Sequence, residues 1–182
     1  MADASVRPAV PADAGDIARV QAAAWSRTYA GLLPAEDLAA AGSDRAEETW
    51  RAAVTSPPSQ HHRVLTALSG ERVVGFAALS PAGDPDLQPA LDAELHALCV
   101  DPERVGAGHG SRLVNAAADV MRAAGFDHLH VWVTEQEAPL QDLLRKAGWE
   151  PDGAARSLDL RGDGDVLVGQ VRLSTRIGDD GR

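Results

Sequence analysis

The chain has 182 residues, of which 45% are hydrophobic, and it carries a formal net charge of -10. This length suits a single domain with a sizeable core, and the acidic balance argues against a sequence-independent nucleic-acid binder, because such binding draws its energy from basic side chains. No segment approaches the roughly 18 uncharged apolar residues of a membrane span, and the lone Cys99 cannot form an internal disulfide, so we expect a cytoplasmic protein without membrane or nucleic-acid partners.

The first half of the chain predicts a strand, three helices and a β-hairpin. Asp13 and Ser43 occupy positions where a helix N-cap is expected, and Pro34 suits the first turn of a helix. Two β-rich runs flank a short turn at Gly70, which is the pattern of an antiparallel hairpin. The predicted elements are a strand at 6–9, helices at 13–27, at 34–41 and from 44 to the Pro57–Pro58 pair, and hairpin strands at 63–68 and 72–79.

The second half begins with a predicted exposed loop at 81–89, since this stretch contains three prolines and a glycine. The apolar periodicity then changes from strand to helix and back, which predicts a β-loop-α-β unit. A further helix ends at Gly148, and a last hairpin turns through Gly162 and Gly164. The predicted elements are strands at 93–100, 127–133, 156–160 and 166–174, and helices at 108–124 and 138–147. Together they predict one domain over residues 5–176, with flexible ends at 1–4 and 177–182.

Three glycines alternate with other residues in the stretch VDPERVGAGHGSRLV, just before the predicted helix at 108–124. Unpaired backbone N–H groups at such a helix start, together with the helix dipole, can hold an anion such as a phosphate. A P-loop nucleotide site is excluded, because Ser111 and Arg112 follow the last glycine in place of Lys and Ser or Thr. Two alternatives stay open. One is a dinucleotide-binding fold. Asp127, 21 residues after Gly106, is near the position of the acidic residue of that fold, although the last glycine of its fingerprint is missing here. The other is a glycine turn that binds no ligand.

The residues around this loop resemble the GNAT superfamily of acetyl-CoA-dependent N-acetyltransferases. The resemblance rests on AELHALCV before the loop, DP at its start, GAGHG within it, KAGW after the next strand, and WSRTYAGLLP near the N-terminus. It covers about residues 6–175 and implies an α+β fold, an α/β/α sandwich. The implied sheet is mixed and mostly antiparallel, has six or seven strands flanked by helices, and has its fourth and fifth strands splayed apart. The resemblance also implies acetyl-CoA as the cosubstrate and no metal.

In this family, the pantetheine arm pairs with the free edge of the fourth strand, and the diphosphate binds the loop that follows. The implied pantetheine contacts in this chain are Leu98, Cys99 and Val100. The implied diphosphate contacts are Val105, Gly106, Ala107, Gly108, His109, Gly110 and Ser111. Val105 departs from the family's Gln or Arg at the first motif position. Glu137 and Leu144 stand where many members have an Asn and the Tyr that protonates the leaving thiolate, so we expect Glu137 to contact the cofactor and the usual acid to be missing.

The candidate catalytic side chains lie on the predicted strand at 93–100. Glu94 and His96 are two residues apart there, so their side chains are expected on the same face of the strand. The side chain of Ala97 is expected on the opposite face. The resemblance places Glu94 where family members often carry the general base, and partial burial would suit a carboxylate to that role. His96 is a relay to that base, the base itself, or a structural histidine. Trp25 and Tyr29 are expected to line the acceptor side.

The sequence therefore predicts an N-acetyltransferase that moves an acetyl group from acetyl-CoA directly to a primary amine. The amine belongs to a small molecule, a peptide N-terminus or a lysine, and nothing in the residues selects among them. A homodimer is frequent in the family, and two apolar faces, near Trp149 and the final hairpin, suit one. The alternative functions are a non-catalytic acyl-CoA-binding module and a dinucleotide-dependent oxidoreductase.

Overall fold

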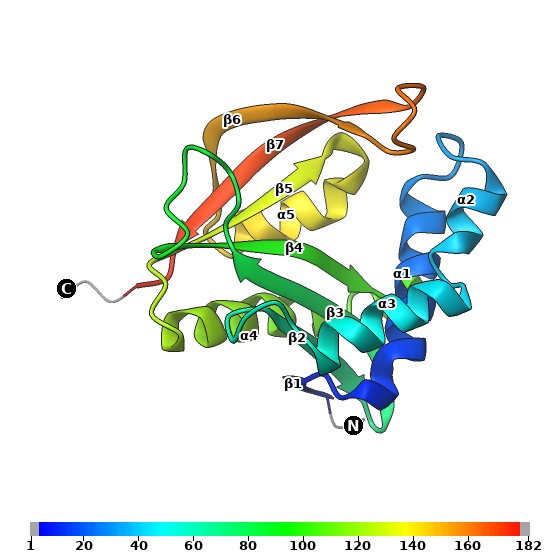
Figure 1. The fold of residues 1–182 in the computed structure, drawn as a ribbon, viewed down its shortest axis with the longest axis horizontal. Coiled ribbons are helices and arrows are strands. Elements are labelled where there is room, and N and C mark those ends of the chain that lie inside the picture. The colour runs from blue at the N-terminus through cyan, green and yellow to red at the C-terminus, as the bar shows by residue number, and fades with distance from the viewer. Residues whose placement is uncertain (1–3, 179–182) are drawn as a thin grey trace.

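The computed structural model describes residues 4–178, whose strands form one seven-stranded sheet (Figure 1). Across the sheet the strands follow the order β1-β2-β3-β4-β5-β7-β6. The strands are β1 (Ala4–Pro8), β2 (Arg63–Ser69), β3 (Arg72–Pro81), β4 (Asp92–Val100), β5 (His128–Thr134), β6 (Glu150–Asp159) and β7 (Leu167–Arg176). The helices are α1 (Ala14–Thr28), α2 (Ala35–Ala40), α3 (Asp44–Thr55), α4 (His109–Ala123) and α5 (Ala138–Lys146).

Helices cover both faces of this sheet (Figure 1). On one face, Ile17 of α1 packs against Phe76 of β3, with Trp50 of α3 beside them. On the other face, α4 and α5 close the larger core. The apolar residues of α4 recur at helical spacing, and Leu113 and Met121 are fully buried there. The α/β/α arrangement of the predicted α+β fold is therefore confirmed.

The strands β4 and β5 separate along their length. They run parallel, and Asp92–Glu94 of β4 pairs with His128–His130 of β5, after which no further pair joins them in the described chain. β5 instead pairs over its whole length with β7, and β4 pairs with β3 as far as Val100. The carboxyl-terminal half of β4 therefore has a backbone edge that faces β5 without a ladder partner, so the predicted splay of the fourth and fifth strands is confirmed.

A β-bulge in β4 changes which way its side chains point. Ala78 of β3 pairs with Ala97 and Leu79 pairs with Leu95, so His96 has no partner in the ladder. Before the bulge, Leu95 belongs to the core against α4, whereas after it Ala97 packs against the α1 face. The expectation that Ala97 points away from the face of Glu94 was therefore wrong, because one extra residue reverses the alternation.

Most predicted elements begin and end within two residues of the observed ones, and β6 is the main exception. It was predicted from 156 but begins at Glu150, and its pairing with β7 is interrupted between Pro151 and Ala155. Proline and glycine in this stretch are typical of loops, which hid the strand. Asp13 also differs from its predicted N-cap role, because its carboxylate accepts no hydrogen bond from its helix and pairs with Arg7 at 2.6 Å.

The described chain is fixed slightly beyond the predicted domain limits of 5 and 176. Ala4 opens β1, and Ile177 is only 4% exposed, with its backbone N–H donating to the carbonyl of Asp127 at 2.8 Å. The rest of the two ends that we expected to be flexible lies outside the described residues. Among residues 4–178, no helix combines the length and the hydropathy needed to cross a membrane.

Candidate active site

The three alternating glycines at the start of α4 have two different roles. Gly106 and Gly108 adopt φ values of +87° and +80°, in the left-handed region that side chains other than glycine rarely enter. Gly110 has no such conformation, but a Cβ atom there would lie 2.8 Å from Cδ2 of Leu143. The first two glycines therefore shape the turn, and the third allows α5 to pack closely on α4.

This turn presents a row of unpaired donors. Within the described chain, the backbone N–H groups from Gly106 to Ser111 donate to no protein acceptor, and the first bond of α4 runs from Arg112 N–H to the carbonyl of Gly108. Val105 is 62% exposed, and residues 106–108 are exposed as well. These N–H groups lie at the positive end of a helix of 15 residues, so the turn can hold an anion without any lysine.

His109 contributes to this turn through its backbone alone. Its side chain is buried, and burial, followed by the positive charges of Arg112 and Arg104, lowers the pKa of its imidazole. Arg112 folds back over the turn, where its guanidinium donates to the carbonyl of Ala107 at 3.0 Å. The turn is thus held by its own residues while its outward N–H groups stay open.

The turn leads directly into the gap between β4 and β5. Of the three β4 residues predicted to contact a pantetheine arm, Leu98 and Val100 pack toward the core under α4, and Cys99 packs toward α1. Their backbone groups on the β5 side have no ladder partner, so an extended ligand can add to this edge as a further strand would. Burial raises the pKa of the Cys99 thiol to about 12, so this cysteine is not an activated nucleophile.

Tyr29 and Glu137 face this gap beside Cys99. Glu137 accepts hydrogen bonds from Thr134 N–H at 2.8 Å and from the Thr134 hydroxyl at 3.2 Å, and burial raises the pKa of its carboxyl. Burial, and then the nearby Glu137, raises the pKa of Tyr29 to about 12. Trp25, 39% exposed, lies edge-on to Tyr29 with ring centroids 6.2 Å apart. Tyr29 therefore lies close to Thr134, Glu137 and Cys99. Trp25 packs on it, and the role of both aromatic residues toward an acceptor stays a prediction.

Leu144, at the position where relatives carry a tyrosine, is 0% exposed in the core. Its side chain has no ionisable group, and the absence of the usual acid from the reaction stays a prediction.

The bulge brings Glu94 and His96 into contact at the closed end of the gap. Nδ1 of His96 lies 3.1 Å from Oε1 of Glu94, and Nε2 lies 2.5 Å from Oγ of Ser80 on β3. The side chain of Glu94 is 11% exposed, whereas that of His96 is 48% exposed. A nearly buried carboxylate is therefore linked to solvent through an imidazole, an arrangement suited to moving protons.

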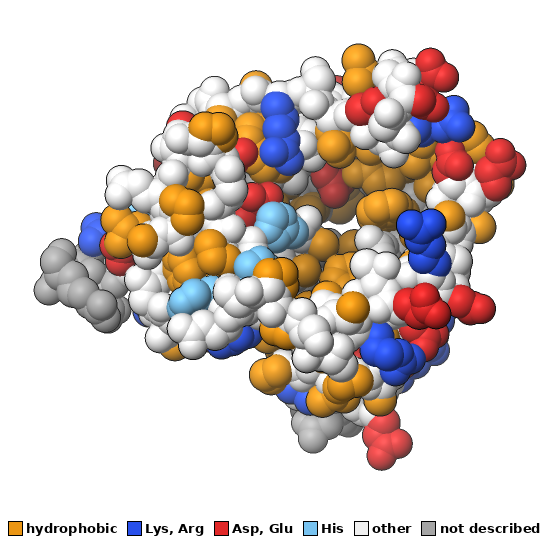
Figure 2. Space-filling model, in the orientation of Figure 1, with side chains coloured by type: hydrophobic (Ala, Val, Ile, Leu, Met, Phe, Trp, Pro, Cys, Tyr) orange, Lys and Arg blue, Asp and Glu red, His pale blue; other side chains and the backbone are white. Residues whose placement is uncertain are grey.

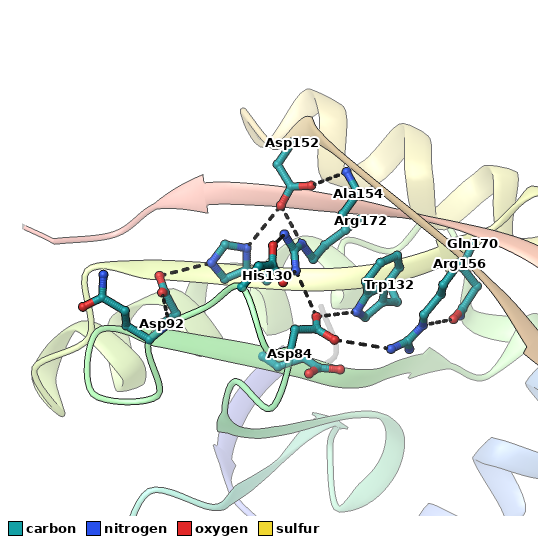
Figure 3. A network of polar contacts seen from close by, with 12 residues as sticks. Asp84, Asp92, His130, Trp132, Asp152, Ala154, Arg156, Gln170 and Arg172 are labelled. Atoms are coloured by element: carbon teal, nitrogen blue, oxygen red, sulfur yellow. Dashed lines mark hydrogen bonds and ion pairs between the residues drawn. The ribbon is translucent and has the colours of Figure 1, made fainter.

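The loop at 82–91 joins β3 to β4, and Arg172 of β7 binds its aspartates (Figure 3). Arg172 is 4% exposed and donates to Asp84 at 3.1 Å and to Asp152 of β6 at 2.6 Å, and it also binds Asp86. Trp132 of β5 donates to Asp84 at 2.8 Å. These hydrogen bonds hold the Pro-rich loop against β5 and β7, and Arg172 also ties β7 to β6.

A hollow opens between the strands β4 and β5 and the helices α1 and α2 (Figure 2). Hydrophobic side chains form its floor, and histidine side chains gather beside it. The tip of the β6–β7 hairpin reaches α2 across this hollow, where Nε of Arg161 lies 3.1 Å from Asp37. Arg156 stacks on the Trp132 ring at 4.1 Å from its centroid. Among the described residues, no group of three or more His, Cys, Asp or Glu side chains could hold a metal ion.

Sequence reasoning missed Ser80, Asp84, Trp132 and Arg172. Ser80 is 16 residues from His96, and Arg172 is 88 residues from Asp84, so no local spacing connects them. The aspartates of the Pro-rich loop were visible in the sequence. Only the strand register shows that they lie opposite an arginine.

Comparisons with known proteins agree with this geometry. Residues 24–149 match the model of the acetyltransferase (GNAT) family. The chain is 30% identical over 134 residues, 72% of each chain, to the uncharacterized N-acetyltransferase YuaI of Bacillus subtilis. It is 35% identical over 98 residues to the N-alpha-acetyltransferase RimI of Mycobacterium tuberculosis, which is 54% of this chain and 58% of that protein.

Two solved structures share the fold. One is the PaiA N-acetyltransferase of Thermoplasma acidophilum in complex with coenzyme A, with a TM-score of 0.75, 19% identity, and coverage of 96% of this chain and 99% of that one. The other is YncA of Salmonella typhimurium with acetyl-CoA, with a TM-score of 0.72, 16% identity, and coverage of 98% of this chain and 96% of that one. At these identities the likeness shows the fold alone.

Proposed function

This chain belongs to the acetyltransferase (GNAT) family and is an acyltransferase, and we propose that it moves the acetyl group of acetyl-CoA directly to a primary amine. The observation that carries the proposal is the row of unpaired N–H groups from Gly106 to Ser111, which opens into the gap between β4 and β5. Family membership removes the alternative of a dinucleotide-dependent oxidoreductase.

The unpaired N–H groups of the turn and the free edge of β4 support acetyl-CoA as the cosubstrate. The diphosphate binds the N–H groups of residues 105–111, where the helix dipole favours negative charge. The pantetheine arm pairs with the free edge of β4 at Leu98–Val100, and Glu137 lies across the gap from it. Val105 replaces the family's Gln or Arg at little cost, because the donors here are backbone groups.

Glu94 acts as the general base in this proposal. An alkylammonium with a pKa of about 10.4 must lose a proton before its nitrogen can attack, which costs about 4.6 kcal/mol at pH 7 if it happens in advance. Glu94 takes this proton as the nitrogen bonds to the acetyl carbon and the carbon–sulfur bond breaks. The sulfur leaves as a thiolate, since a thiol with a pKa of about 8.5 tolerates the charge and Leu144 offers no proton.

The acceptor is the amine of a small molecule or of a polypeptide. In this proposal the acceptor enters through the hollow in Figure 2, from the side of α1 and α2, and Trp25 and Tyr29 at the end of α1 contact it. The similarity to an N-alpha-acetyltransferase supports a peptide N-terminus among the candidates. We also propose that the protein is cytoplasmic, because its lone Cys99 cannot form an internal disulfide, and that it forms a homodimer, which is frequent in the family.

A thermal-shift screen followed by an amine panel tests the proposal. Acetyl-CoA is expected to raise the melting temperature by binding the native state, whereas NAD and NADP leave it unchanged. Thiol release is then measured with amino acids, polyamines, aminoglycosides and peptides with free N-termini. Stabilisation by acetyl-CoA without thiol release from any amine would identify a non-catalytic acyl-CoA-binding module.

A further inference from the structure

Ser80, His96 and Glu94 form a line of hydrogen-bonding groups across two strands. Ser80 is the register partner of Glu94, and the bulge at His96 turns the imidazole back so that it lies between them. His96 Nδ1 lies 3.1 Å from Glu94, and Nε2 lies 2.5 Å from Ser80 Oγ. Ser80 is 5% exposed, so its hydroxyl is shielded from water.

The second contact of Ser80 bears on which groups in this line donate hydrogen bonds and which accept them. Its hydroxyl donates to the carbonyl of Pro81 at 2.8 Å, and a hydroxyl has one hydrogen to give. With that hydrogen directed at Pro81, Ser80 Oγ accepts from His96 in the tautomer that carries a hydrogen on Nε2. In this arrangement Nδ1 and the Glu94 carboxylate need one further, shared proton between them, since two bare acceptors 3.1 Å apart would repel each other.

When the pair loses that shared proton, the hydrogen bonds must change. Nδ1 keeps the one remaining hydrogen and donates it to the Glu94 carboxylate, which leaves Nε2 as an acceptor. The Ser80 hydroxyl then rotates away from Pro81 and donates to Nε2. Ser80 thus makes two hydrogen bonds when the pair holds the proton and one when it does not, so it favours the state with the proton bound.

We infer that Ser80 is a positioning residue that strengthens the Glu94–His96 pair as a base, an inference that rests on the proposed acetyl transfer. The proton that Glu94 takes from the ammonium group leaves to water through the half-exposed imidazole of His96. By holding the imidazole in place from the buried side, Ser80 keeps this route aligned.

Serine, histidine and a carboxylate also form the nucleophilic triad of hydrolases, but here the serine hydrogen is placed differently. A nucleophilic serine donates its hydrogen to Nε2 in the resting state, whereas Ser80 directs its hydrogen to the Pro81 carbonyl as long as the Glu94–His96 pair holds the shared proton. Its burial also leaves little room for an acyl group. An acetylated Ser80 is therefore an outcome that would contradict the inference.

Other charged groups near the pair are themselves paired. On β5, His130 is the register partner of Glu94, and its Nε2 lies 3.2 Å from Asp92. Burial would raise the pKa of Asp92, but the Gln88 N–H and His130 hold it below its ordinary value. Glu137 faces Cys99 and Tyr29, farther along the gap.

The test compares Ser80→Ala with Ser80→Thr, which keeps the hydroxyl, and with Ser5→Ala on the exposed edge strand as a control for the substitution itself. The loss of one hydrogen bond from the proton-bound state predicts that Ser80→Ala moves the acid limb of the kcat/KM profile to lower pH by about half a unit to one unit. The plateau kcat falls about threefold to tenfold because the base is weaker. KM for acetyl-CoA stays within twofold, and Ser80→Thr and Ser5→Ala behave like the wild type.

A second measurement does not depend on activity. An NMR titration of the His96 ring in the free protein is expected to show the same downward shift of the midpoint in Ser80→Ala, with unchanged melting as evidence of folding. An unmoved or raised midpoint, or a mass increase of one acetyl group on Ser80 after incubation with acetyl-CoA, would overturn the inference. If the wild type releases no thiol with any amine, the proposed function fails, while the titration still decides the role of Ser80.

Discussion

Glu94 lies 3.1 Å from His96 because a single unpaired residue interrupts the ladder between β3 and β4. In a regular strand the side chains of Glu94 and His96 would lie on the same face, and nothing would turn the imidazole toward Ser80. The bulge turns the imidazole back toward Ser80 and leaves the carboxylate almost buried. The proposed base is therefore a product of strand register as much as of residue type.

Replacing Glu94 with Gln is expected to lower turnover at least tenfold while acetyl-CoA binds with unchanged affinity. The amide has nearly the same shape but takes up no proton, so only amine that is already neutral can react. The loss should shrink as pH rises, because more of the acceptor is then neutral. Rate profiles from pH 6 to 9 measure this, with Glu150→Gln, an exposed residue on β6, as the matched control. Unchanged kinetics would transfer the role of base to His96 or to water.

A negative charge at Ala107 should weaken acetyl-CoA binding. Ala107 is exposed in the turn and has an ordinary negative φ, so Ala107→Asp adds charge among the free N–H groups without backbone strain. The dissociation constant of acetyl-CoA is expected to rise at least tenfold in Ala107→Asp. In Ala107→Asn, whose side chain has the same shape without the charge, it should stay within threefold of the wild-type value. Titration calorimetry at 0.15 M salt separates the two variants. Gly108 is a poorer site for this test, because its φ of +80° makes any side chain strained. Equal affinities would place the diphosphate elsewhere.

The single tyrosine should ionise at unusually high pH. Burial, and then Glu137, raises the pKa of Tyr29 to about 12, above the ordinary value of 10. A raised value means that this group stabilises the fold fully below about pH 10, and that the contribution is lost as pH rises through about 12. Because the chain has one tyrosine, the tyrosinate absorbance reports Tyr29 alone, and Tyr29→Phe removes the signal. Ionisation near pH 10 in protein that circular dichroism shows to be folded would contradict this burial.

Removing Arg172 should destabilise the protein strongly. Arg172 is 4% exposed, and its hydrogen bonds to Asp84, Asp86 and Asp152 raise the pKa of its guanidinium. Arg172→Leu removes a buried guanidinium and its hydrogen bonds to three partly or fully exposed carboxylates, so the free energy of unfolding is expected to fall by about 1.5–3 kcal/mol. Arg51→Gln, which breaks an exposed ion pair with Glu47 on α3, should cost less than about 1 kcal/mol. Urea unfolding at pH 7 compares them. Similar losses would mean that Arg172 does not hold the loop at 82–91.

Much of the site was predictable from short stretches of sequence. Gly106 and Gly108 mark the turn because their left-handed backbone is a local requirement. Ser43 caps α3 as predicted, with its hydroxyl accepting from the N–H of Ala46. The sequence also located Glu94 and His96 on one strand. It could not show the bulge, since that depends on how β3 pairs with β4.

By itself, then, the sequence determined the family, the order of the elements and the glycine turn, because these depend on residues only a few positions apart. The tertiary structure alone decided that Gly110 makes room for Leu143, that β6 begins at Glu150, and that Ser80 meets His96. These contacts join residues that are distant along the chain. They exist only once strand order and register bring the elements together, and one bulge or one-residue slip would exchange the partners.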